Sequence, residues 1–317
     1  MTMLSLLVRQ IRFEAVGVNS YELVDPAGAD LPAVTAGTHI DVLLDDGVVR
    51  QYSLCNDPAE RHRYVIAVLL EGQGKGGSRK LHETLHVQDR VSVSLPRNNF
   101  ALADGAGKHL LIGGGIGITP LKAMAHALAS DGADFELHYC AKSPEHASFR
   151  DELARLGDGS VTFHYDGGKP AAGLDIAALL RGRATSIHVY YCGPPGFMAA
   201  CAAATADWPA GTVHSEHFKA PELAQSTVQD TVASTVQIAS TGLCLDIPAG
   251  RSMVDVLNDA GLEVETSCVS GLCGSCKVRY LSGEVDHQDF ILSEDERAEY
   301  LTTCVSRAKG PVLVLDL

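Results

Sequence analysis

The sequence predicts a multidomain protein in which an antiparallel β-barrel domain, an α/β domain with a parallel sheet and a small α+β domain follow one another. The length of 317 residues suits two or three domains of about 100 to 200 residues each. Near residue 105 the hydrophobic pattern changes from short strand-like runs to strand-then-helix units. Further on, the polar stretch "KAPELAQSTVQDTVAST" has no apolar period and is typical of a linker. We therefore expect domains at residues 1–105, 106–224 and 225–317.

The first domain carries the signals of antiparallel β structure. "HIDVLLDDGVVRQYSL" and "RYVIAVLLEG" are strand-like runs broken by Asp-Gly or Glu-Gly turn pairs. One short helix is predicted around "GSRKLHETL". A run of short strands joined by such turns favours a barrel.

The second domain alternates strands and helices. "KHLLIGGGIGITPLKAMAHALASDGADFELHYCAKS" predicts an apolar strand, a glycine turn, a helix that ends near Gly132 and a second strand. "SVTFHYD" and "SIHVYYCGPPGFMAACAAATADW" repeat the strand-then-helix order. This alternation predicts a parallel sheet covered by helices.

The third domain begins after the linker. "TVQIASTGLCLDIPAG" predicts a hairpin and "SMVDVLNDAG" a short helix, followed by a cysteine-rich loop and a closing strand at "PVLVLDL".

Composition restricts the possible functions. Hydrophobic residues make up 46% of the chain, enough for folded cores, and the net charge of −14 argues against general nucleic-acid binding. The opening "MTMLSLLVRQ" is too short for a signal-peptide core, and no later stretch approaches the roughly 20 apolar residues that span a bilayer. We expect a cytoplasmic enzyme with no membrane partner, in a compartment where thiols stay reduced.

The negative charge is concentrated near the C-terminus. Residues 233–317 carry 13 Asp and Glu against 6 Lys and Arg, half of the net charge of the chain. This excess is either a solvated acidic surface or a face that steers a basic protein partner.

The most specific motif is "CVSGLCGSCK" together with a distant cysteine in "YLTTCVS". The spacing C-x4-C-x2-C with a fourth cysteine far downstream is that of a plant-type 2Fe-2S site. Gly271 and Gly274 give the loop the backbone freedom to wrap a cluster. Zinc is the alternative, but structural zinc sites favour two paired ligand hooks, and no second hook accompanies the downstream cysteine. The predicted iron ligands are Cys268, Cys273, Cys276 and Cys304. The other cysteines are expected to be mostly small buried side chains: Cys55, Cys140, Cys192, Cys201 and Cys244.

"SCVSGLCGSC" with "CVSRAKGPVLVLDL" resembles the C-terminal ferredoxin domain of the phthalate dioxygenase reductase family. The order barrel, α/β domain and ferredoxin is that of the family, and the resemblance covers the whole chain. It implies a β-grasp fold for residues 225–317, and FMN rather than FAD, since relatives with a C-terminal ferredoxin use the mononucleotide. It also implies that the protein is the NADH-dependent reductase component of an aromatic-ring oxygenase or oxidative demethylase. Its partner would be a terminal oxygenase of the Rieske type.

The predicted flavin site begins at "RQYSL", which is similar to the R-x-Y-S motif of the ferredoxin-NADP reductase superfamily. There Tyr52 would pack on the flavin, and Ser53 would offer a hydroxyl near the redox nitrogen of the ring. "GQGKGGSRKL" is a glycine-rich turn that opens a helix, with Lys75 and Ser78 placed to meet the FMN phosphate. Taken alone, these glycines could form a simple hairpin turn. The predicted flavin-binding residues are Arg50, Gln51, Tyr52, Ser53, Ala67, Val68, Leu69, Lys75, Gly76, Gly77 and Ser78.

The predicted nicotinamide site combines two motifs. "IGGGIGITPL" suits a phosphate-cradling turn but does not spell G-x-G-x-x-G, so a strict Rossmann site is not predicted. It resembles instead the G-G-x-G-x-T-P turn of the superfamily, and "YYCGPPGFM" resembles the superfamily's C-G-P motif. The residues implied are Gly114, Gly115, Gly117, Thr119, Pro120, Cys192, Gly193 and Pro194, with Phe197 beside the cofactor.

In "HSEHF", Glu216 and Phe218 occupy the place where the chain of the family returns to the flavin. Cys192 could equally be a packed core thiol, and Glu216 a surface carboxylate. The residues implied to take part in hydride transfer are Ser53, Thr119, Cys192 and Glu216.

NADH is favoured over NADPH by "YCAKSPEHASFRDEL", where Lys142 and Arg150 are interspersed with three carboxylates. A site for the extra phosphate of NADPH usually gathers several cations.

Together the motifs predict electron flow from NADH through FMN to the cluster, because a flavin accepts hydride and releases single electrons. Two other functions remain open: a redox-sensing flavin and iron–sulfur module without sustained turnover, and a self-contained reductase of a small molecule. Rapid NADH-driven reduction of an artificial acceptor would favour an enzyme over a sensor.

Overall fold

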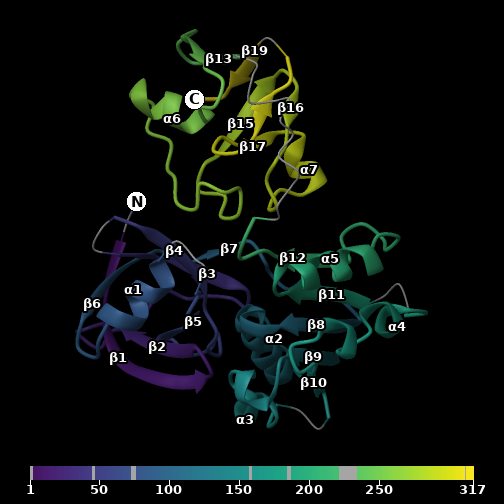
Figure 1. The fold of residues 1–317 in the computed structure, drawn as a ribbon. Coiled ribbons are helices and arrows are strands. Elements are labelled where there is room, and N and C mark those ends of the chain that lie inside the picture. The colour runs from purple at the N-terminus through teal and green to yellow at the C-terminus, as the bar shows by residue number, and fades with distance from the viewer. Residues whose placement is uncertain are drawn as a thin grey trace. The chain divides into compact units, whose positions relative to one another are not determined.

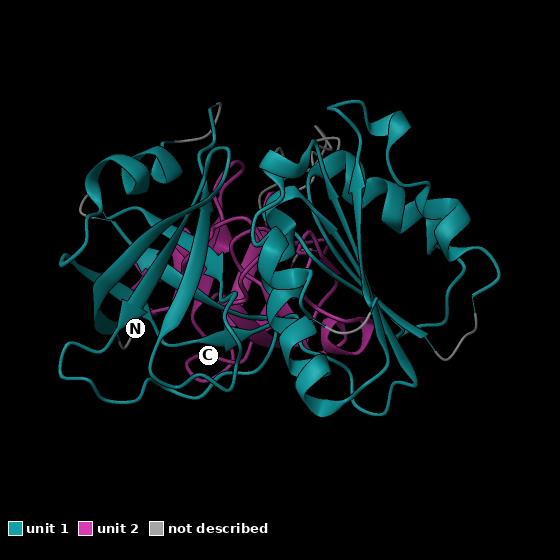
Figure 2. Ribbon diagram, turned by 90° about the horizontal axis from the view of Figure 1, so that it is seen from below, with its two compact units in different colours: residues 1–218 teal, residues 219–317 magenta. Residues whose placement is uncertain are grey.

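The computed structural model describes residues 3–44, 47–72, 76–156, 159–183, 187–220, 234–310 and 312–317. Contacts divide the chain into two compact units, Met1–Phe218 and Lys219–Leu317, which Figure 2 distinguishes by colour. Most of the predicted linker, and the expected boundary between residues 224 and 225, lie outside the described residues. Within the described ranges, no helix is long and apolar enough to cross a membrane.

The first sheet of unit 1 is antiparallel throughout and runs in the order β4-β3-β6-β1-β2-β5, with β7 paired to β3. Its outermost strands, β4 and β5, approach each other at an isolated bridge between Leu54 and Ile66. Apolar residues of the strands and Leu81 of α1 form the core of this sheet. Its elements are β1 (Met3–Ala15), β2 (Val18–Val24), β3 (Thr38–Leu43), β4 (Val49–Ser53), β5 (Tyr64–Leu69), α1 (Gly77–Thr84), β6 (Arg90–Ser94) and β7 (Arg97–Asn98).

The second sheet of unit 1 is parallel, in the order β10-β9-β8-β11-β12 (Figure 1). Helix α2 ends at Asp131 with left-handed Gly132 as its cap, as the sequence predicts. The order of the strands reverses between β8 and β11, and open α/β sheets bind ligands beside the carboxyl ends of the strands at such a reversal. The elements are β8 (Lys108–Gly114), η1 (Gly115–Gly117), α2 (Ile118–Asp131), β9 (Phe135–Ala141), η2 (Pro144–His146), α3 (Arg150–Leu153), β10 (Val161–Tyr165), η3 (Pro170–Ala172), α4 (Ile176–Leu180), β11 (Ile187–Cys192), α5 (Pro195–Ala204) and β12 (Val213–Glu216).

The two sheets of unit 1 share a hydrophobic core. Cys55, Ala67 and Phe100 from the first sheet region pack in one cluster with residues of α2. From α2, the buried Lys122 donates a hydrogen bond to the carbonyl oxygen of Cys55 at 2.7 Å and forms an ion pair of 2.7 Å with Glu152. These contacts fix the first sheet against the parallel sheet.

Unit 2 is a mixed five-stranded sheet, in the order β14-β13-β19-β15-β17, with helix α6 packed against it. β13 and β19 are parallel, whereas the predicted hairpin of β13 and β14 is antiparallel, as is β15 with its two neighbours. This is the α+β arrangement expected of a β-grasp ferredoxin domain. The elements are β13 (Ser234–Ile238), β14 (Cys244–Ile247), α6 (Met253–Asp259), β15 (Lys277–Ser282), β16 (Val285–Asp286), α7 (Glu294–Arg297), β17 (Tyr300–Thr302), β18 (Arg307–Ala308) and β19 (Val312–Leu315).

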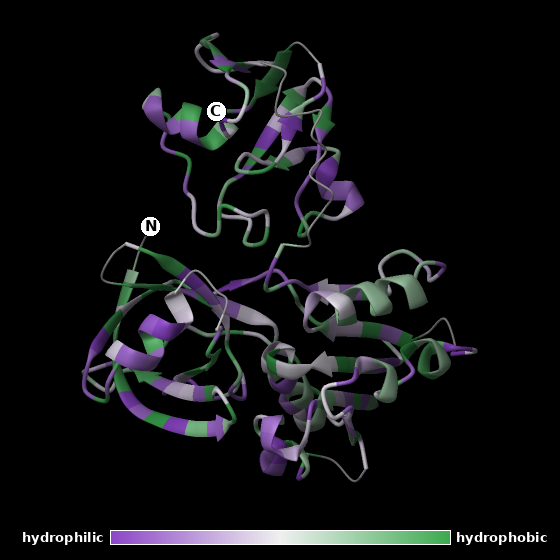
Figure 3. Ribbon diagram, viewed as in Figure 1, coloured by the Kyte–Doolittle hydropathy of each residue, from purple (hydrophilic) through white to green (hydrophobic). Residues whose placement is uncertain are grey.

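Helix α7 contributes to the acidic character of unit 2. Its four residues are all charged, and Figure 3 shows the helix as hydrophilic. Ser293 caps the helix by accepting a hydrogen bond from the Glu296 amide, and the Glu296 carboxylate accepts one from the Ser293 amide in return.

Candidate electron-transfer sites

The four predicted iron ligands come together in unit 2. Cys268, Cys273 and Cys276 lie in the loop between α6 and β15, and Cys304 follows β17. The amides of Ser270 and Leu272 donate to the sulfur of Cys268 at 3.4 and 3.3 Å, and the Cys268 amide donates to the sulfur of Cys273 at 3.5 Å. The loop therefore turns backbone amides toward the thiols, as a cluster with anionic sulfurs requires.

The thiols form two pairs. A hydrogen bond from Cys268 lowers the pKa of Cys273 to about 5, and a hydrogen bond from Cys304 lowers the pKa of Cys276. Among the described residues no three Cys, His, Asp or Glu side chains surround a single-ion position. Four cysteine thiolates hold a 2Fe-2S cluster, and Cys268, Cys273, Cys276 and Cys304 would supply them. The donor set thus fits such a cluster.

Glycine allows the loop to make this wrap. Gly271 has a φ of +70°, and a Cβ there would lie 2.8 Å from Cγ2 of Val305 and 3.0 Å from the Cα of Asp289. Gly274 has a φ of +72°. Both positions are in the left-handed region that glycine adopts most readily.

The remaining cysteines follow the sequence prediction only in part. Cys55, Cys192 and Cys201 are buried, Cys140 is half-buried and Cys244 is exposed. The prediction of burial was wrong for Cys244, because this residue belongs to β14, an outermost strand with alternately exposed side chains.

The predicted flavin residues lie on two facing edge strands of unit 1. In the antiparallel register that the Leu54–Ile66 bridge sets, Ser53 of β4 is opposite Ala67 of β5, and Tyr52 is opposite Val68. No further ladder pair joins β4 and β5 in the described part of the chain. Edge strands present unpaired N–H and C=O groups, so these strands offer hydrogen-bonding groups to a flat ring held along them.

Side chains of β4 alternate between two faces of the strand. Ser53 faces Glu216 of β12, whereas Tyr52 packs against the core of the first sheet. The side chain of Val68 is fully buried in that core, so a contact between Val68 and a flavin would use its main chain. Leu69 and Gln51 are half-buried.

The predicted phosphate end lies at the start of α1. A Cβ on Gly77 would lie 2.4 Å from Nε of Arg50, which places this guanidinium at the helix N-terminus. Gly76 caps the helix with a φ of +84°, and the hydroxyl of Ser78 accepts a hydrogen bond from the Glu71 amide at 3.0 Å. Lys75 lies outside the described residues. The guanidinium group of Arg50, the hydroxyl hydrogen of Ser78 and the amides at the start of α1 are groups that bind a phosphate.

We expect Arg50→Ala and Ser78→Ala each to weaken FMN binding by about 1 to 3 kcal/mol, because at the predicted phosphate site each would remove a charge-assisted hydrogen bond. Fluorescence titration of the apoprotein with FMN measures the change. Arg90→Ala removes an exposed arginine from β6 of the same sheet and should leave the affinity unchanged. Wild-type affinity in both site variants would place the phosphate elsewhere.

The predicted nicotinamide residues meet at the reversal between β8 and β11. A Cβ on Gly117 would lie 2.2 Å from the carbonyl oxygen of Cys192, so the two motifs pack backbone against backbone. A Cβ on Gly114 would lie 3.0 Å from Cδ of Pro194 and 3.1 Å from the ring of Phe197. Gly193, Gly115 and Pro120 belong to the same two segments, and η1 also lies against β5, the predicted flavin strand.

Thr119 and Cys192 are both buried. The Thr119 hydroxyl donates to the Ile116 carbonyl oxygen at 3.1 Å, and burial raises the pKa of Cys192 well above its ordinary value. A neutral thiol at this position contributes shape and weak polarity rather than charge.

Glu216 links the predicted flavin and nicotinamide residues, because it contacts Ser53 of β4 and is the register partner of Cys192 on β11. The hydroxyl of Ser53 donates to its Oε2 at 3.1 Å, across 163 positions of sequence. Burial raises the pKa of Glu216 to about 7, although the Ser53 hydrogen bond favours the anion. The carboxyl group therefore exchanges its proton near neutral pH. Phe218, two residues further on, is 39% exposed.

Sequence reasoning missed His39, which is fully buried beside this site. Its Nδ1 lies 3.8 Å from Oε1 of Glu216. An available signal was the "THIDV" strand, where two polar side chains alternate with apolar ones in a strand pairing with "RQYS".

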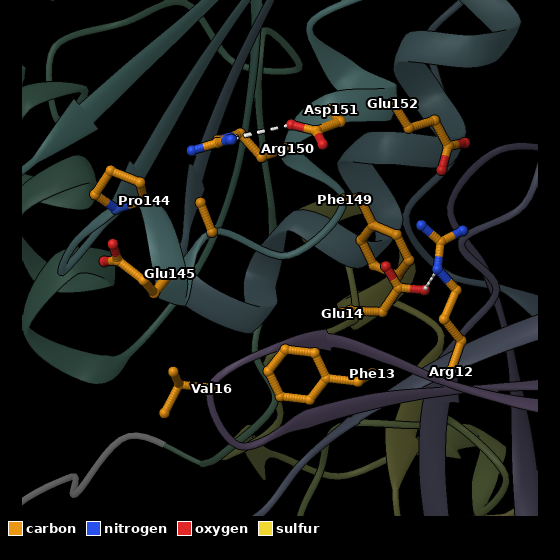
Figure 4. A pocket seen from close by; sticks show the side chains of 11 residues that line it. Arg12, Phe13, Glu14, Val16, Pro144, Glu145, Phe149, Arg150, Asp151 and Glu152 are labelled. Carbon is orange, nitrogen blue, oxygen red and sulfur yellow. Dashed lines mark hydrogen bonds and ion pairs between the residues drawn. The ribbon is translucent and has the colours of Figure 1, made fainter.

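A cavity of about 510 Å³ among the described residues does not coincide with these residues. It lies between the β1–β2 turn and the segment that follows β9 (Figure 4). The lining of the cavity includes the guanidinium groups of Arg12 and Arg150 and four carboxylates. Its acidic residues are Glu14, Glu145, Asp151 and Glu152.

Comparisons with known proteins agree with this arrangement. The model of the 2Fe-2S iron-sulfur cluster binding domain family matches residues 236–309. The reductase subunit of a tert-butanol monooxygenase / tert-amyl alcohol desaturase from Aquincola tertiaricarbonis is 54% identical, with 100% of this chain and 96% of the relative covered. A vanillate O-demethylase oxidoreductase from a Pseudomonas strain is 42% identical over 99% of this chain and all of the relative.

Among solved structures, phthalate dioxygenase reductase is matched with a TM-score of 0.73 and 42% identity, over 99% of this chain and 98% of that chain. Its structure is described as modular, for electron transfer from pyridine nucleotides to 2Fe-2S.

Fold and sites together define an oxidoreductase that passes electrons from a pyridine nucleotide to a 2Fe-2S cluster. The chain belongs to the phthalate dioxygenase reductase family. Its cofactors are those of the family: FMN, NADH and the 2Fe-2S cluster.

Proposed function

We propose that this protein is the reductase component of a multicomponent oxygenase system and delivers electrons from NADH to a Rieske-type terminal oxygenase in the cytoplasm. The observation that carries the proposal is a loop whose amides donate to the sulfurs of Cys268 and Cys273, in a chain whose other unit brings Ser53, Glu216, Gly117 and Cys192 together. Relatives that the chain matches almost end to end are reductases of a monooxygenase, of vanillate O-demethylase and of phthalate dioxygenase. Nine cysteines without a disulfide suit a reducing compartment.

Bound FMN supplies the exchange between a two-electron hydride and single electrons. The protein residues position the reactants and exchange one proton. Gly114, Gly117 and the Cys192–Pro194 segment shape the nicotinamide crevice by close backbone packing. Ser53 presents a hydroxyl between β4 and Glu216, and Glu216 takes up or releases a proton near neutral pH.

The segment that follows β9 supports NADH as the donor. Arg150, one of the two cations that the sequence offers there, is paired with Asp151 at 3.2 Å. This ion pair leaves less positive charge for the extra phosphate of NADPH, which several cations usually bind.

We also retain the three-domain division at 1–105, 106–224 and 225–317. Besides the core that the two sheets of unit 1 share, the antiparallel sheet, the parallel sheet and the cluster-binding sheet each have a further cluster of buried apolar residues, which supports this division.

The acidic unit 2 is proposed as the docking face for the oxygenase. We expect electron delivery to the cognate oxygenase to slow as salt rises, because the reach of surface charges shrinks to about 8 Å at physiological ionic strength. Reduction of the bound FMN by NADH should depend much less on salt, since that reaction takes place in a local crevice. Stopped-flow measurement of both steps across one salt series provides the comparison.

Equal salt dependence of the two steps, or none in delivery, would reject the electrostatic docking face. The face would then be sought among apolar residues of the cluster loop, such as Val269, which is 55% exposed, and Leu272. Failure to reduce any oxygenase, with rapid FMN reduction, would reject the reductase role itself.

A further inference from the structure

A row of polar side chains crosses three strands of the first sheet beneath Glu216. His39 of β3 is the register partner of Ser53 on β4 and of Arg97 on β7. Asp41, two residues along β3, accepts a hydrogen bond from Arg97 at 2.6 Å. Ser53, His39 and Arg97 therefore form one cross-strand row, and Glu216 contacts Ser53 and His39 from β12.

His39 is buried with both ring nitrogens lacking a hydrogen-bond partner. A buried polar side chain with no partner costs about 1 to 3 kcal/mol, and such groups are rare away from functional sites. Burial, and then the charge of Arg97, lower the pKa of His39 to about 4, so the ring is neutral at pH 7. A neutral imidazole has one N–H donor and one acceptor nitrogen.

One carboxyl oxygen of Glu216 lies beside His39 without a hydrogen bond between them. Ser53 is the hydrogen-bond donor to its Oε2, and Oε1 faces His39 Nδ1 at 3.8 Å. This distance exceeds that of a hydrogen bond, so the two groups face each other without being bonded in this structure. When the Ser53 hydroxyl turns toward a flavin on the β4 edge, Oε2 loses its donor, and the unpartnered Nδ1 of His39 lies beside the other carboxyl oxygen.

We propose that His39 is a positioning residue that donates a hydrogen bond from Nδ1 to Glu216, and that it holds the carboxyl group in place when Ser53 turns toward the flavin. The N–H then lies on Nδ1, and Nε2 is left as the acceptor. Nε of Arg97, on the register-paired residue, is a buried donor without a partner, which matches that acceptor. This inference rests on the proposed role of Glu216 and extends it to a residue outside the family motifs.

The polar and titratable groups that contact or pair with His39 and Glu216 come from four strands. They are Asp41 on β3, Ser53 on β4, Arg97 on β7 and Cys192 on β11. Cys192, the register partner of Glu216, is a neutral thiol, and Arg97 and Asp41 neutralise each other. Burial raises the pKa of Glu216 to about 7, so its carboxyl group can be followed by a titration around neutral pH.

The test compares His39→Asn with His39→Gln in the oxidised holoprotein. Asn places an amide donor near the position of Nδ1, whereas Gln places it near Nε2, so both variants keep a polar group of similar size. The carboxyl carbon of Glu216 is followed by NMR through a pH titration in protein with labelled glutamate, and its resonance is assigned by its loss in Glu216→Gln. We expect His39→Gln to make Glu216 bind its proton up to about tenfold more tightly, and His39→Asn to remain within about twofold of wild type.

The Ser53→Ala background tests the replacement of one donor by the other. If His39 supports the carboxyl group when Ser53 does not, His39→Gln shifts the titration more in Ser53→Ala protein than in wild type. Ile40→Val, which loosens β3 on its opposite face, is the matched control and should leave the titration unchanged. An identical Glu216 titration in His39→Gln, His39→Asn and wild type in both backgrounds overturns the inference.

Failure of the proposed function gives a different result. If Glu216→Gln reduces FMN with NADH as fast as wild type, the role of Glu216 in hydride transfer is wrong, while the NMR titration still decides whether His39 holds the carboxyl group.

Discussion

Cys273→Ser is expected to abolish electron delivery beyond the flavin while leaving reduction of FMN by NADH close to the wild-type rate. Cys273 is buried, and its sulfur accepts hydrogen bonds from Cys268, so its loss breaks one of the two thiol pairs. Even outer partners of a metal ligand contribute about 10- to 100-fold to affinity or activity, so loss of a ligand should reduce delivery by at least about 100-fold. The flavin and nicotinamide residues belong to the other compact unit and should keep their arrangement.

Three measurements check this result: iron and labile sulfide per chain, stopped-flow reduction of FMN, and reduction of an oxygenase or an artificial one-electron acceptor. Cys244→Ser is the matched control, because Cys244 lies in β14 of the same unit and is exposed. Stoichiometric zinc without labile sulfide in the wild-type protein would contradict the iron–sulfur assignment. Loss of NADH-to-FMN transfer in Cys273→Ser protein that retains FMN would contradict the independence of the two sites.

The elements of the fold follow closely from local patterns in the sequence. Strand-like runs with Asp-Gly or Glu-Gly turn pairs predicted β3, β4 and β5 of the first sheet, and the glycine after the α2 pattern marked the end of that helix at Gly132. These signals reside in a few consecutive residues. The shared core of the two sheets in unit 1 depends instead on contacts such as that of Lys122 with Cys55, between residues 67 positions apart. No local pattern encodes such a contact.

The site residues also fall into those that local sequence patterns predict and those that only long-range contacts bring together. Three of the four cluster cysteines fall within nine positions, so spacing alone predicted their convergence. The Ser53–Glu216 hydrogen bond joins residues 163 positions apart, and only the family resemblance pointed to Glu216. His39 was missed because a buried histidine in a strand looks like ordinary core until its unpartnered nitrogens are seen.

Gly117→Ala is expected to slow reduction of FMN by NADH by about 100-fold, since displacing reacting groups by about 1 Å can cost that much. A Cβ at residue 117 would lie 2.2 Å from the carbonyl oxygen of Cys192 and 2.6 Å from the amide nitrogen of Gly193, so the two segments of the nicotinamide crevice must separate. Both obstacles are backbone atoms, which cannot rotate away as a flexible side chain does. The same overpacking should lower the free energy of unfolding by about 1 to 3 kcal/mol.

Gly196→Ala is the matched control for this substitution. Gly196 lies in α5, close in sequence to the same crevice, and a Cβ there meets nothing within 4 Å. Alanine also favours a helix over glycine, so this variant should retain the wild-type rate and gain slightly in stability. Stopped-flow reduction at saturating NADH, with FMN content and thermal unfolding measured on the same samples, separates a misplaced nicotinamide from lost flavin or lost fold. Wild-type reduction in Gly117→Ala protein that retains FMN would mean that hydride transfer does not depend on close packing of η1 against the Cys192–Pro194 segment, and the crevice between β8 and β11 would no longer be the nicotinamide site.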